Sequence, residues 1–208
     1  MKRISPTRIA LLTLRKEREI AVRGHKLLKD KRDGLIREFV RVVRDSREKR
    51  RLVDQKLGSA FAAYERASVM SEAGVLERAL AVPSGKVTID VIMVNIMSVK
   101  VPRFHVAKEG SAVCYGLVGT PGDLDAAIIR FEALFLDLVR LAEMEKTIER
   151  LAQEIETTRR RVSALENILI PELEEKIKFV AMQLEERARG AVVTTMRIKA
   201  MILEKEGA

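Results

Sequence analysis

The pair Gly85-Lys86 is the part of the sequence that comes nearest to a nucleotide-binding motif. A phosphate-binding loop needs a Ser or Thr directly after its Lys, and a first Gly at the start of the loop, so that backbone and hydroxyl groups surround the phosphates. Here Val87 follows Lys86, and Leu80 stands where the first Gly is required. The motif fails at two positions, and we therefore expect no direct nucleotide binding.

The two histidines and the single cysteine are the other candidates for catalysis or metal binding. Neither His25 nor His105 has cysteines or a carboxylate cluster at the spacing of metal ligands, and His25 lies among Lys and Arg, as a surface or seam histidine does. Cys114 has no histidine nearer than His105, nine residues away, so we expect a packed thiol rather than a nucleophile. Carboxylate neighbours such as Glu174 and Glu175 are typical of a solvated helix. We expect no cofactor, no metal and no catalytic activity.

Composition favours long helices over a compact core. A third of the 208 residues are charged, only 4% are aromatic and there is no Trp, so burial must come from narrow apolar seams of Leu, Ile, Val, Ala and Met. A lone cysteine favours a reducing cytosolic compartment. The most apolar stretch, residues 87–99, is interrupted by polar residues and too short to cross a bilayer, and no secretory segment opens the sequence. We expect a soluble chain without direct membrane insertion.

Positive charge is concentrated at the two ends of the chain. Residues 1–33 contain eleven Lys or Arg against four Asp or Glu, and residues 187–208 contain five against two. The 153 residues between them carry 23 basic and 24 acidic side chains and are almost neutral. If the two ends lie side by side, they form one basic tip. Such a tip suits nucleic acid, or a protein cavity lined with acidic or carbonyl groups.

Residues 1–80 are predicted to form the first helical arm. Ser5 can cap a helix whose first position is Pro6. Apolar residues then recur at alternating steps of three and four, as in the seam of a coiled coil. The arm is expected to break at Gly74 and to end before Pro83. The seam of this arm includes Val53, Leu57, Ala60 and Tyr64.

Residues 122–208 are predicted to form the second arm, which opens after a group of helix-start residues at 120–123. Pro171 should bend this helix, because it lacks a backbone donor and crowds the carbonyl of Asn167. The seam of this arm includes Ile148, Leu151, Ile155, Val162, Leu165 and Leu169, and continues through Thr195, Ile198 and Ile202.

The insert between the arms, residues 81–121, is rich in β-forming residues. Apolar and polar residues alternate from Val87 to Met93, a second β-rich run extends from Ala112 to Val118, and glycines punctuate the stretch. The predicted fold is mainly α: a long antiparallel two-helix coiled coil, or helical hairpin, with a small β-hairpin between its arms. If the chain reverses near residues 78 and 122, facing residues have numbers that add up to about 200, which pairs Leu12 with the neighbourhood of Ala188.

Three parts of the sequence resemble the D subunit of the archaeal and vacuolar-type rotary ATPases. The first comprises SPTRIALLTLRKE (residues 5–17) and RGHKLLKDKRDGLIREF (residues 23–39). The second is the short pair SVKVPR (residues 98–103) and VGTP (residues 118–121). The third, TTRRRVSALENILIPELEEKIKFV, covers residues 157–180. The long first and third segments are specific, and the β insert otherwise matches least.

The resemblance implies a non-catalytic central rotor shaft at the cytoplasmic face of the membrane, coupling rotation of a proton- or sodium-translocating ring to a catalytic hexamer. The paired ends would enter the hexamer, in which catalytic A subunits alternate with non-catalytic B subunits. The hairpin insert would lie toward the small F subunit and a funnel-shaped subunit on the membrane ring. The residues implied at the hexamer-facing tip are Thr7, Arg8, Arg15, Arg18, Arg197 and Lys199.

A nucleic-acid-binding coiled-coil arm that uses the same basic tip is the alternative hypothesis. Its affinity would fall steeply with salt, because bound counterions are released from the nucleic acid. The chain has no aromatic stacking platform and no recognisable reading module, so we expect no nucleic acid as a partner. Nothing in the sequence distinguishes protons from sodium ions, or synthesis from hydrolysis.

Overall fold

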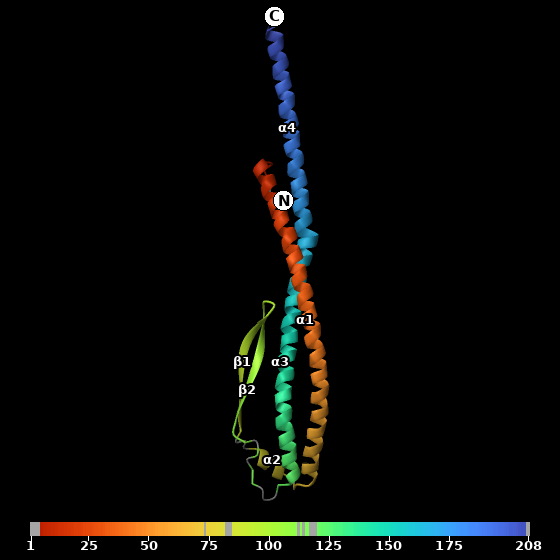
Figure 1. The fold of residues 1–208 in the computed structure, drawn as a ribbon, viewed down its shortest axis with the longest axis vertical. Helices are drawn as coiled ribbons and strands as arrows, with labels where there is room; N and C mark the ends of the chain where they lie inside the picture. Colours follow the sequence, from red (N-terminus) through yellow and green to blue (C-terminus); the bar gives the residue numbers. More distant parts are fainter. Residues whose placement is uncertain are drawn as a thin grey trace. The chain divides into compact units, whose positions relative to one another are not determined.

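The computed structural model describes residues 5–72, 74–81, 85–111, 113, 115–116 and 120–206. Its elements are α1 (Arg8–Val69), α2 (Val75–Leu80), β1 (Lys86–Ile96), β2 (Val99–Glu109), α3 (Gly122–Ala164), the π-helical turn η1 (Leu165–Leu169) and α4 (Ile170–Glu206). The predicted mainly α fold, with a helix pair and a β-hairpin between its two arms, is confirmed (Figure 1). No helix in this part of the chain has a stretch apolar and long enough to cross a bilayer.

The chain forms two compact units. The first unit combines Met1–Arg32 with Thr157–Ala208, and the second is Asp33–Glu156. Each unit therefore contains a piece of α1 together with a piece of the helices that follow the insert.

In the first unit, the start of α1 is fixed by Thr7. The Thr7 hydroxyl accepts a hydrogen bond from the backbone N–H of Ala10 at 3.1 Å, and the Thr7 carbonyl accepts one from Leu11. Thr7 is thus the N-cap, and our prediction of Ser5 was wrong by two residues. Behind this cap, Leu14 and Ala21 pack against the second helix in a buried apolar cluster with Leu173 and Val180.

The two helices of the first unit are antiparallel, and their register differs from the predicted one. Arg18 lies against Glu174, and Arg187 donates a hydrogen bond to the carbonyl of Pro6 at 2.8 Å. The numbers of these facing residues add up to 192 and 193 rather than about 200. Leu12 therefore does not face Ala188. The difference arises because α1 ends at Val69, earlier than the reversal near residue 78 on which the prediction depended.

A π-helical turn precedes Pro171. In η1 the backbone N–H of Ile170 donates to the carbonyl of Leu165, five residues back. A π turn holds one more residue than an α turn, and the wider turn accommodates a proline that has no N–H and a ring that crowds the preceding carbonyls. The extra residue also rotates the apolar face: Leu169 is 41% exposed, whereas Ile170 packs on the cluster of the first unit.

In the second unit, α1 and α3 are joined by a narrow apolar seam. Val53 is buried with Leu134 and Leu141, and an edge-to-face pair of Phe61 and Phe131 lies further along with ring centroids 5.5 Å apart. Beyond them α2 folds back, because its Leu76 is buried with Ala67 and Leu124. The separate helix begins after Gly74, whose φ of 80° is easily adopted only without a side chain.

The β-hairpin belongs to the second unit and differs from its prediction in one strand. The first strand, β1, includes the predicted run from Val87 to Met93, but its partner is Val99–Glu109 rather than the run from Ala112 to Val118. Ala112, Cys114, Leu117 and Val118 lie outside the described residues, and Val113, Tyr115 and Gly116 are not in a strand. The prediction placed the second strand too late because it missed that two residues alone can reverse the chain.

Those two residues are Met97 and Ser98, whose φ values of 49° and 71° form a two-residue turn with both centres left-handed. Near this turn Val99 and Val101 are buried with Leu35 and Leu151 of the helices. Gly34, in the middle of α1, leaves room for Met97, because a Cβ there would lie 2.5 Å from the Met97 methyl carbon. Packing of this end of the hairpin on the helices thus offsets the conformational cost of two left-handed turn residues that are neither Gly nor Asn.

The register of the first unit can be tested by cross-linking. In a chain whose Cys114 is replaced by Ser, a Cys at Leu14 should form a disulfide in a scan of positions 173–190, with a maximum near 177–180. A disulfide needs Cα atoms within about 7 Å, which only residues across the seam satisfy. The yield is measured by electrophoresis without reductant. A maximum near position 186, which the predicted register requires, would contradict the observed pairing.

Candidate functional site

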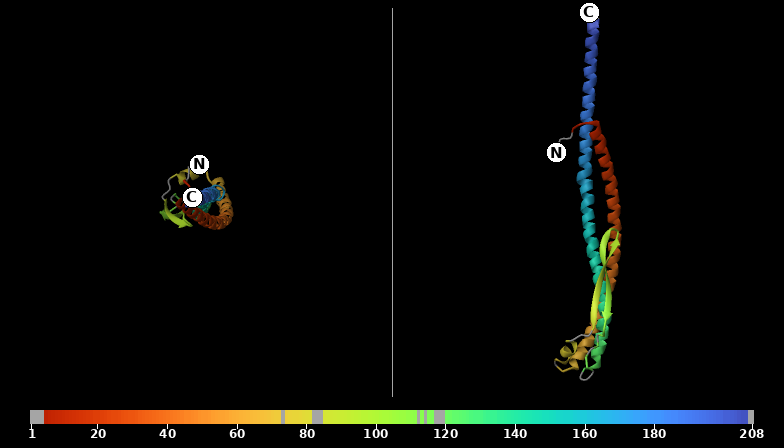
Figure 2. Two further views of the ribbon diagram at one scale, coloured as in Figure 1. Left: turned by 90° about the horizontal axis from the view of Figure 1, so that it is seen from above. Right: turned by 90° about the vertical axis from the view of Figure 1, so that its left-hand side faces the viewer.

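The end of α4 is the most exposed helical surface of the first unit. Arg187 lies level with Pro6, and in Figures 1 and 2 α4 continues well beyond the start of α1. Every residue from 185 to 203 is exposed. The segment from 188 to 203 therefore has no helix packed beside it among the described residues, and at 1.5 Å per residue it extends about 24 Å past the pairing.

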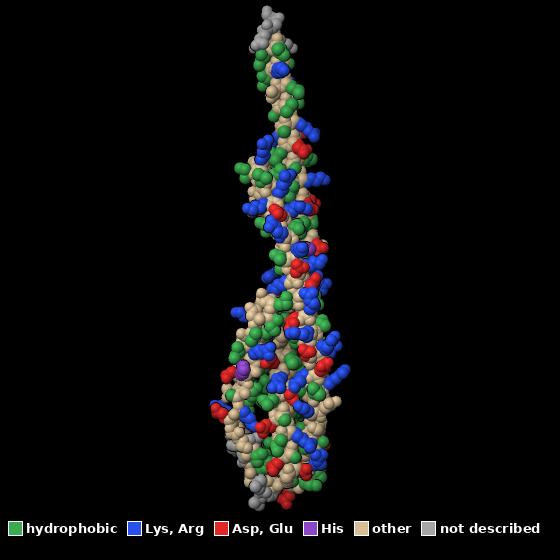
Figure 3. Space-filling model, in the orientation of Figure 1, with side chains coloured by type: hydrophobic (Ala, Val, Ile, Leu, Met, Phe, Trp, Pro, Cys, Tyr) green, Lys and Arg blue, Asp and Glu red, His purple; other side chains and the backbone are tan. Residues whose placement is uncertain are grey.

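This free segment of α4, residues 188–203, combines apolar side chains with positive charge. It contains three basic residues, Arg189, Arg197 and Lys199, and no acidic residue. Figure 3 shows hydrophobic side chains gathered along it, with basic ones between them. Its exposed large apolar residues are Val192, Val193, Met196, Ile198, Met201, Ile202 and Leu203. A helix that is apolar on several sides and has no packing partner is suited to enter a cavity in another protein.

The structure separates the predicted tip residues into two groups. One group, at the start of α1, is Thr7, Arg8, Arg15 and Arg18, and the other, on α4, is Arg197 and Lys199. Arg197 lies ten residues beyond the level of Pro6, about 15 Å along α4. Arg8 and Arg15 are exposed on the first turns of α1. Thr7 caps α1, and Arg18 is engaged by Glu174, since its Nε and Nη2 both donate to one carboxylate oxygen at 2.8 and 2.6 Å. Arg8, Arg15, Arg197 and Lys199 make no ion pair with any described residue.

The predicted seam residues differ in burial. In the second unit, Val53, Ala60 and Leu151 are buried, while Leu57, Tyr64, Ile148 and Ile155 are half-buried. In the first unit, Val162 is buried, Leu165 is half-buried and Leu169 is exposed. Thr195, Ile198 and Ile202, which the predicted seam also includes, are exposed because no helix in the described part of the chain lies beside them.

Asp137 is a charged residue that the sequence reasoning missed. Its side chain is only 10% exposed and lies within the seam between α1 and α3, where Lys49 and Lys56 approach its two oxygens at 2.6 and 2.5 Å. Hydrogen bonds from Lys49 and then Lys56 lower the pKa of Asp137 to about 2, although burial opposes the shift. The carboxylate therefore stays charged and holds two cations across the helix pair.

A sequence signal for this site does exist. Leu134 and Leu141 are seven residues apart on one face of α3, and Asp137 occupies the seam position between them. Lys49 and Lys56 are also seven residues apart, on either side of the buried Val53. An acidic residue in one seam opposite two basic residues around the other would have indicated the register of this unit.

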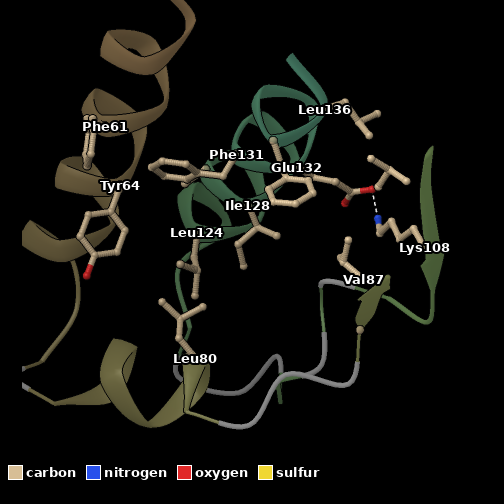
Figure 4. Close-up of a pocket in the computed structure, with 14 residues that line it drawn as sticks. Phe61, Tyr64, Leu80, Val87, Lys108, Leu124, Ile128, Phe131, Glu132 and Leu136 are labelled. Carbon is tan, nitrogen blue, oxygen red and sulfur yellow. Dashed lines mark hydrogen bonds and ion pairs between the residues drawn. The ribbon is translucent and has the colours of Figure 1, made fainter. Parts of the chain in front are cut away.

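A cavity of about 730 Å³ opens between α1, α3 and the base of the hairpin (Figure 4). Its lining is mostly apolar and includes Tyr64, Leu124 and Ile128. On one side Lys108 of β2 forms an ion pair with Glu132 of α3. This hollow could accept apolar side chains of a partner protein.

The two histidines belong to different units. His25 is half-buried beside Glu166, with its Nε2 3.5 Å from a carboxylate oxygen, and His105 lies on β2 opposite Asp90. Within the described part of the chain no three His, Cys, Asp or Glu residues gather as metal ligands would.

Comparison with known proteins shows which family this chain is similar to. The family model for the D subunit of ATP synthase matches residues 10–200. A V-type ATP synthase D subunit of Thermoanaerobacter sp. (strain X514) is 42% identical over 206 residues, 98% of this chain and 99% of the relative. One from Acetivibrio thermocellus is 44% identical over 208 residues, 98% of this chain and 93% of the relative. One from Clostridium botulinum (strain ATCC 19397 / Type A) is 42% identical over 98% of this chain and 96% of its own length.

Replacing Asp137 by Asn should destabilise the chain at neutral pH by about 1–2 kcal/mol, because two lysines lose their shared counterion. The pKa of Asp137 is lowered by folding, so its contribution is fully present above pH 4 to 5 and is lost as the pH falls toward 2. Urea unfolding of both chains should therefore show a difference at pH 7 that shrinks at pH 2 to 3. The matched control, Glu149→Gln, removes an exposed i,i+3 pair with Lys146 and should cause no measurable change. An equal difference at both pH values would contradict this account.

Proposed function

This chain belongs to the family of ATP synthase D subunits, and from that membership we propose that it is the central rotor shaft of a V/A-type ATPase. It couples rotation of a proton- or sodium-translocating membrane ring to conformational change in a catalytic hexamer. The observation that carries the proposal is similarity along nearly the whole chain to proteins named as D subunits of V-type ATP synthases. The helix pairing and the free segment of α4 agree with it.

The helix pair offers a physical basis for coupling. Two different helices side by side present a different surface in each direction, so each of three surrounding sites meets a different face. Each site favours the conformation that binds the facing side of the shaft most tightly. Turning the shaft therefore changes the favoured conformation of the three sites in sequence. The reverse also holds, because nucleotide-driven closure of a site favours the shaft orientation that it binds best.

The free segment of α4 and the first turns of α1 form the hexamer-facing end in this proposal. Catalytic A subunits and non-catalytic B subunits would surround them. Arg8, Arg15, Arg197 and Lys199 are exposed there, and the apolar residues of the free segment have no partner among the described residues. Thr7 and Arg18 have structural roles at this end, as the cap of α1 and as the partner of Glu174.

The second unit carries the contacts with the rest of the rotor. The small F subunit and the funnel-shaped subunit above the membrane ring are the proposed partners. In support, this unit has the hollow beside Lys108 and Glu132 and an exposed apolar strand. The complex would lie at the cytoplasmic face of the membrane, with this chain attached peripherally through its partners.

Nucleotide chemistry belongs to the hexamer in this proposal, and the chain itself is non-catalytic and binds no cofactor. The alternative, a nucleic-acid-binding coiled coil, receives no support from these relatives, which are named as ATP synthase subunits.

Ending the chain after Arg187 should separate folding from function. The removed residues 188–208 include the free segment, so the thermal midpoint should stay within about 2 °C of the full chain. Association with a co-expressed hexamer of A and B subunits should weaken at least about tenfold, which corresponds to about 1.4 kcal/mol. Thermal unfolding followed by circular dichroism measures the first effect, and sizing chromatography with nucleotide turnover measures the second.

A charge-matched pair of variants refines this test. Arg197→Gln with Lys199→Gln should weaken association with the hexamer, whereas Arg159→Gln with Arg161→Gln, two exposed cations of α3 in the same unit, should not. If the truncated chain binds and activates the hexamer as the full chain does, the free segment is not the hexamer-facing end.

A further inference from the structure

The backbone of the β-hairpin has two outer edges, and the pairing register says which groups point toward them. β1 and β2 pair from Lys86 opposite Glu109 to Ile96 opposite Val99, closed by a two-residue turn. The pair that flanks such a turn is hydrogen-bonded, and hydrogen-bonded pairs then alternate with pairs that are not. In β1, the N–H and C=O groups that point away from β2 are therefore those of Val87, Ile89, Val91, Met93 and Asn95.

The outer edge of β2 is blocked in its middle. Among its outward positions, Pro102 has no N–H to offer, and the N–H of Phe104 donates to a carboxylate oxygen of Glu143 at 2.9 Å. The ion pair of Lys108 with Glu132 fixes the same edge to α3 further along. Proline and engaged donors are the devices by which proteins keep a sheet edge from pairing with another chain.

The outer edge of β1 is open. Within the described residues the sheet has two strands, so no strand pairs with this edge, and every residue from Lys86 to Asn95 is at least partly exposed. The outward positions from 87 to 93 all carry exposed apolar side chains: Val87, Ile89, Val91 and Met93. The strand has no proline and only two charges, Lys86 and Asp90. It thus lacks the protection that β2 has.

We propose that β1 is a docking edge to which an extended strand of another subunit of the ATPase complex adds, turning the hairpin into a three-stranded sheet. Such a strand would carry apolar residues at alternate positions, and a Lys or Arg beside Asp90, the acidic residue of β1. This inference rests on the proposed function, in which a single helix pair turns at the centre of three surrounding sites. A partner subunit, rather than a second copy of this chain, is therefore the occupant.

Hydrogen exchange of the β1 amides tests the inference in the intact proteins. In the isolated chain the amides of Val87, Ile89, Val91, Met93 and Asn95 should exchange quickly, while those bonded to β2 exchange slowly. In the assembled ATPase complex the outward amides should become protected as well, which mass spectrometry detects as reduced deuterium uptake in a peptide covering 86–96. Rapid exchange of these amides in an intact, active complex would overturn the inference and leave the proposed function standing.

A proline at the centre of the edge provides a second test. Val91→Pro removes an outward N–H at a position equivalent to that of Pro102, which the hairpin already tolerates. It should abolish the protection of the neighbouring outward amides in the complex, whereas Val91→Ala, which keeps the N–H, should preserve it. Unchanged exchange of the inward amides checks that the hairpin remains folded. Equal protection in both variants would show that no strand adds to β1.

Two further outcomes would also overturn the inference. Protection that appears in the isolated chain as its concentration rises, together with dimers on sizing, would assign the edge to a second copy and overturn the partner assignment. A chain that never assembles with hexamer subunits would overturn the proposed function, and this inference with it.

Discussion

The antiparallel packing of α1 against the helices that follow the insert is the interaction on which the rest of the structure depends. Isolated helices gain little stability from propensity alone and need an apolar face packed on a partner. Here that face is narrow: Leu35, Leu151 and Val180 are fully buried, but most neighbours on the same helices are exposed. When the seam is narrow, the register of the two helices is determined by a small number of large apolar residues and by the charged groups beside them. The buried Asp137 with its two lysines in one unit, and Arg18 with Glu174 in the other, occupy such positions.

The same seam determines which surfaces remain for partners. Because α1 begins at Arg8, no described helix lies beside α4 after Arg187, and a basic, apolar segment is left uncovered by the described residues. In the second unit, the hairpin places β2 and its Glu143 contact against α3, and no strand among the described residues pairs with the outer edge of β1. Both surfaces are apolar enough to bind, and neither is covered by a described residue. A protein that functions only inside a larger complex is expected to have such surfaces.

Much of the fold could be predicted from the sequence, because a repeat of apolar residues at steps of three and four requires a partner helix, and residues 120–123 favour a helix start. The register could not, because it depends on where α1 stops, and α1 stops where Leu76 folds back onto Leu124 in a contact that only the folded chain forms. The second strand was misplaced because Met97 and Ser98 are unusual in a tight turn. Leu169 was placed in the seam because the π turn before Pro171, which shifts the helical phase by one residue, has no apolar signature. The basic residues of the tip could be identified from the sequence, but the separation of the tip residues into a group on α1 and a group on α4 follows from the register.

Direct observation of rotation tests the central claim, that this chain is the shaft of its ATPase. A probe attached to the hairpin of the chain, in a complex immobilised through its hexamer, should turn in one direction during nucleotide hydrolysis. It should pause three times in each revolution, since three catalytic sites surround one asymmetric helix pair. A probe that keeps a fixed orientation while the same complex hydrolyses nucleotide would contradict the account.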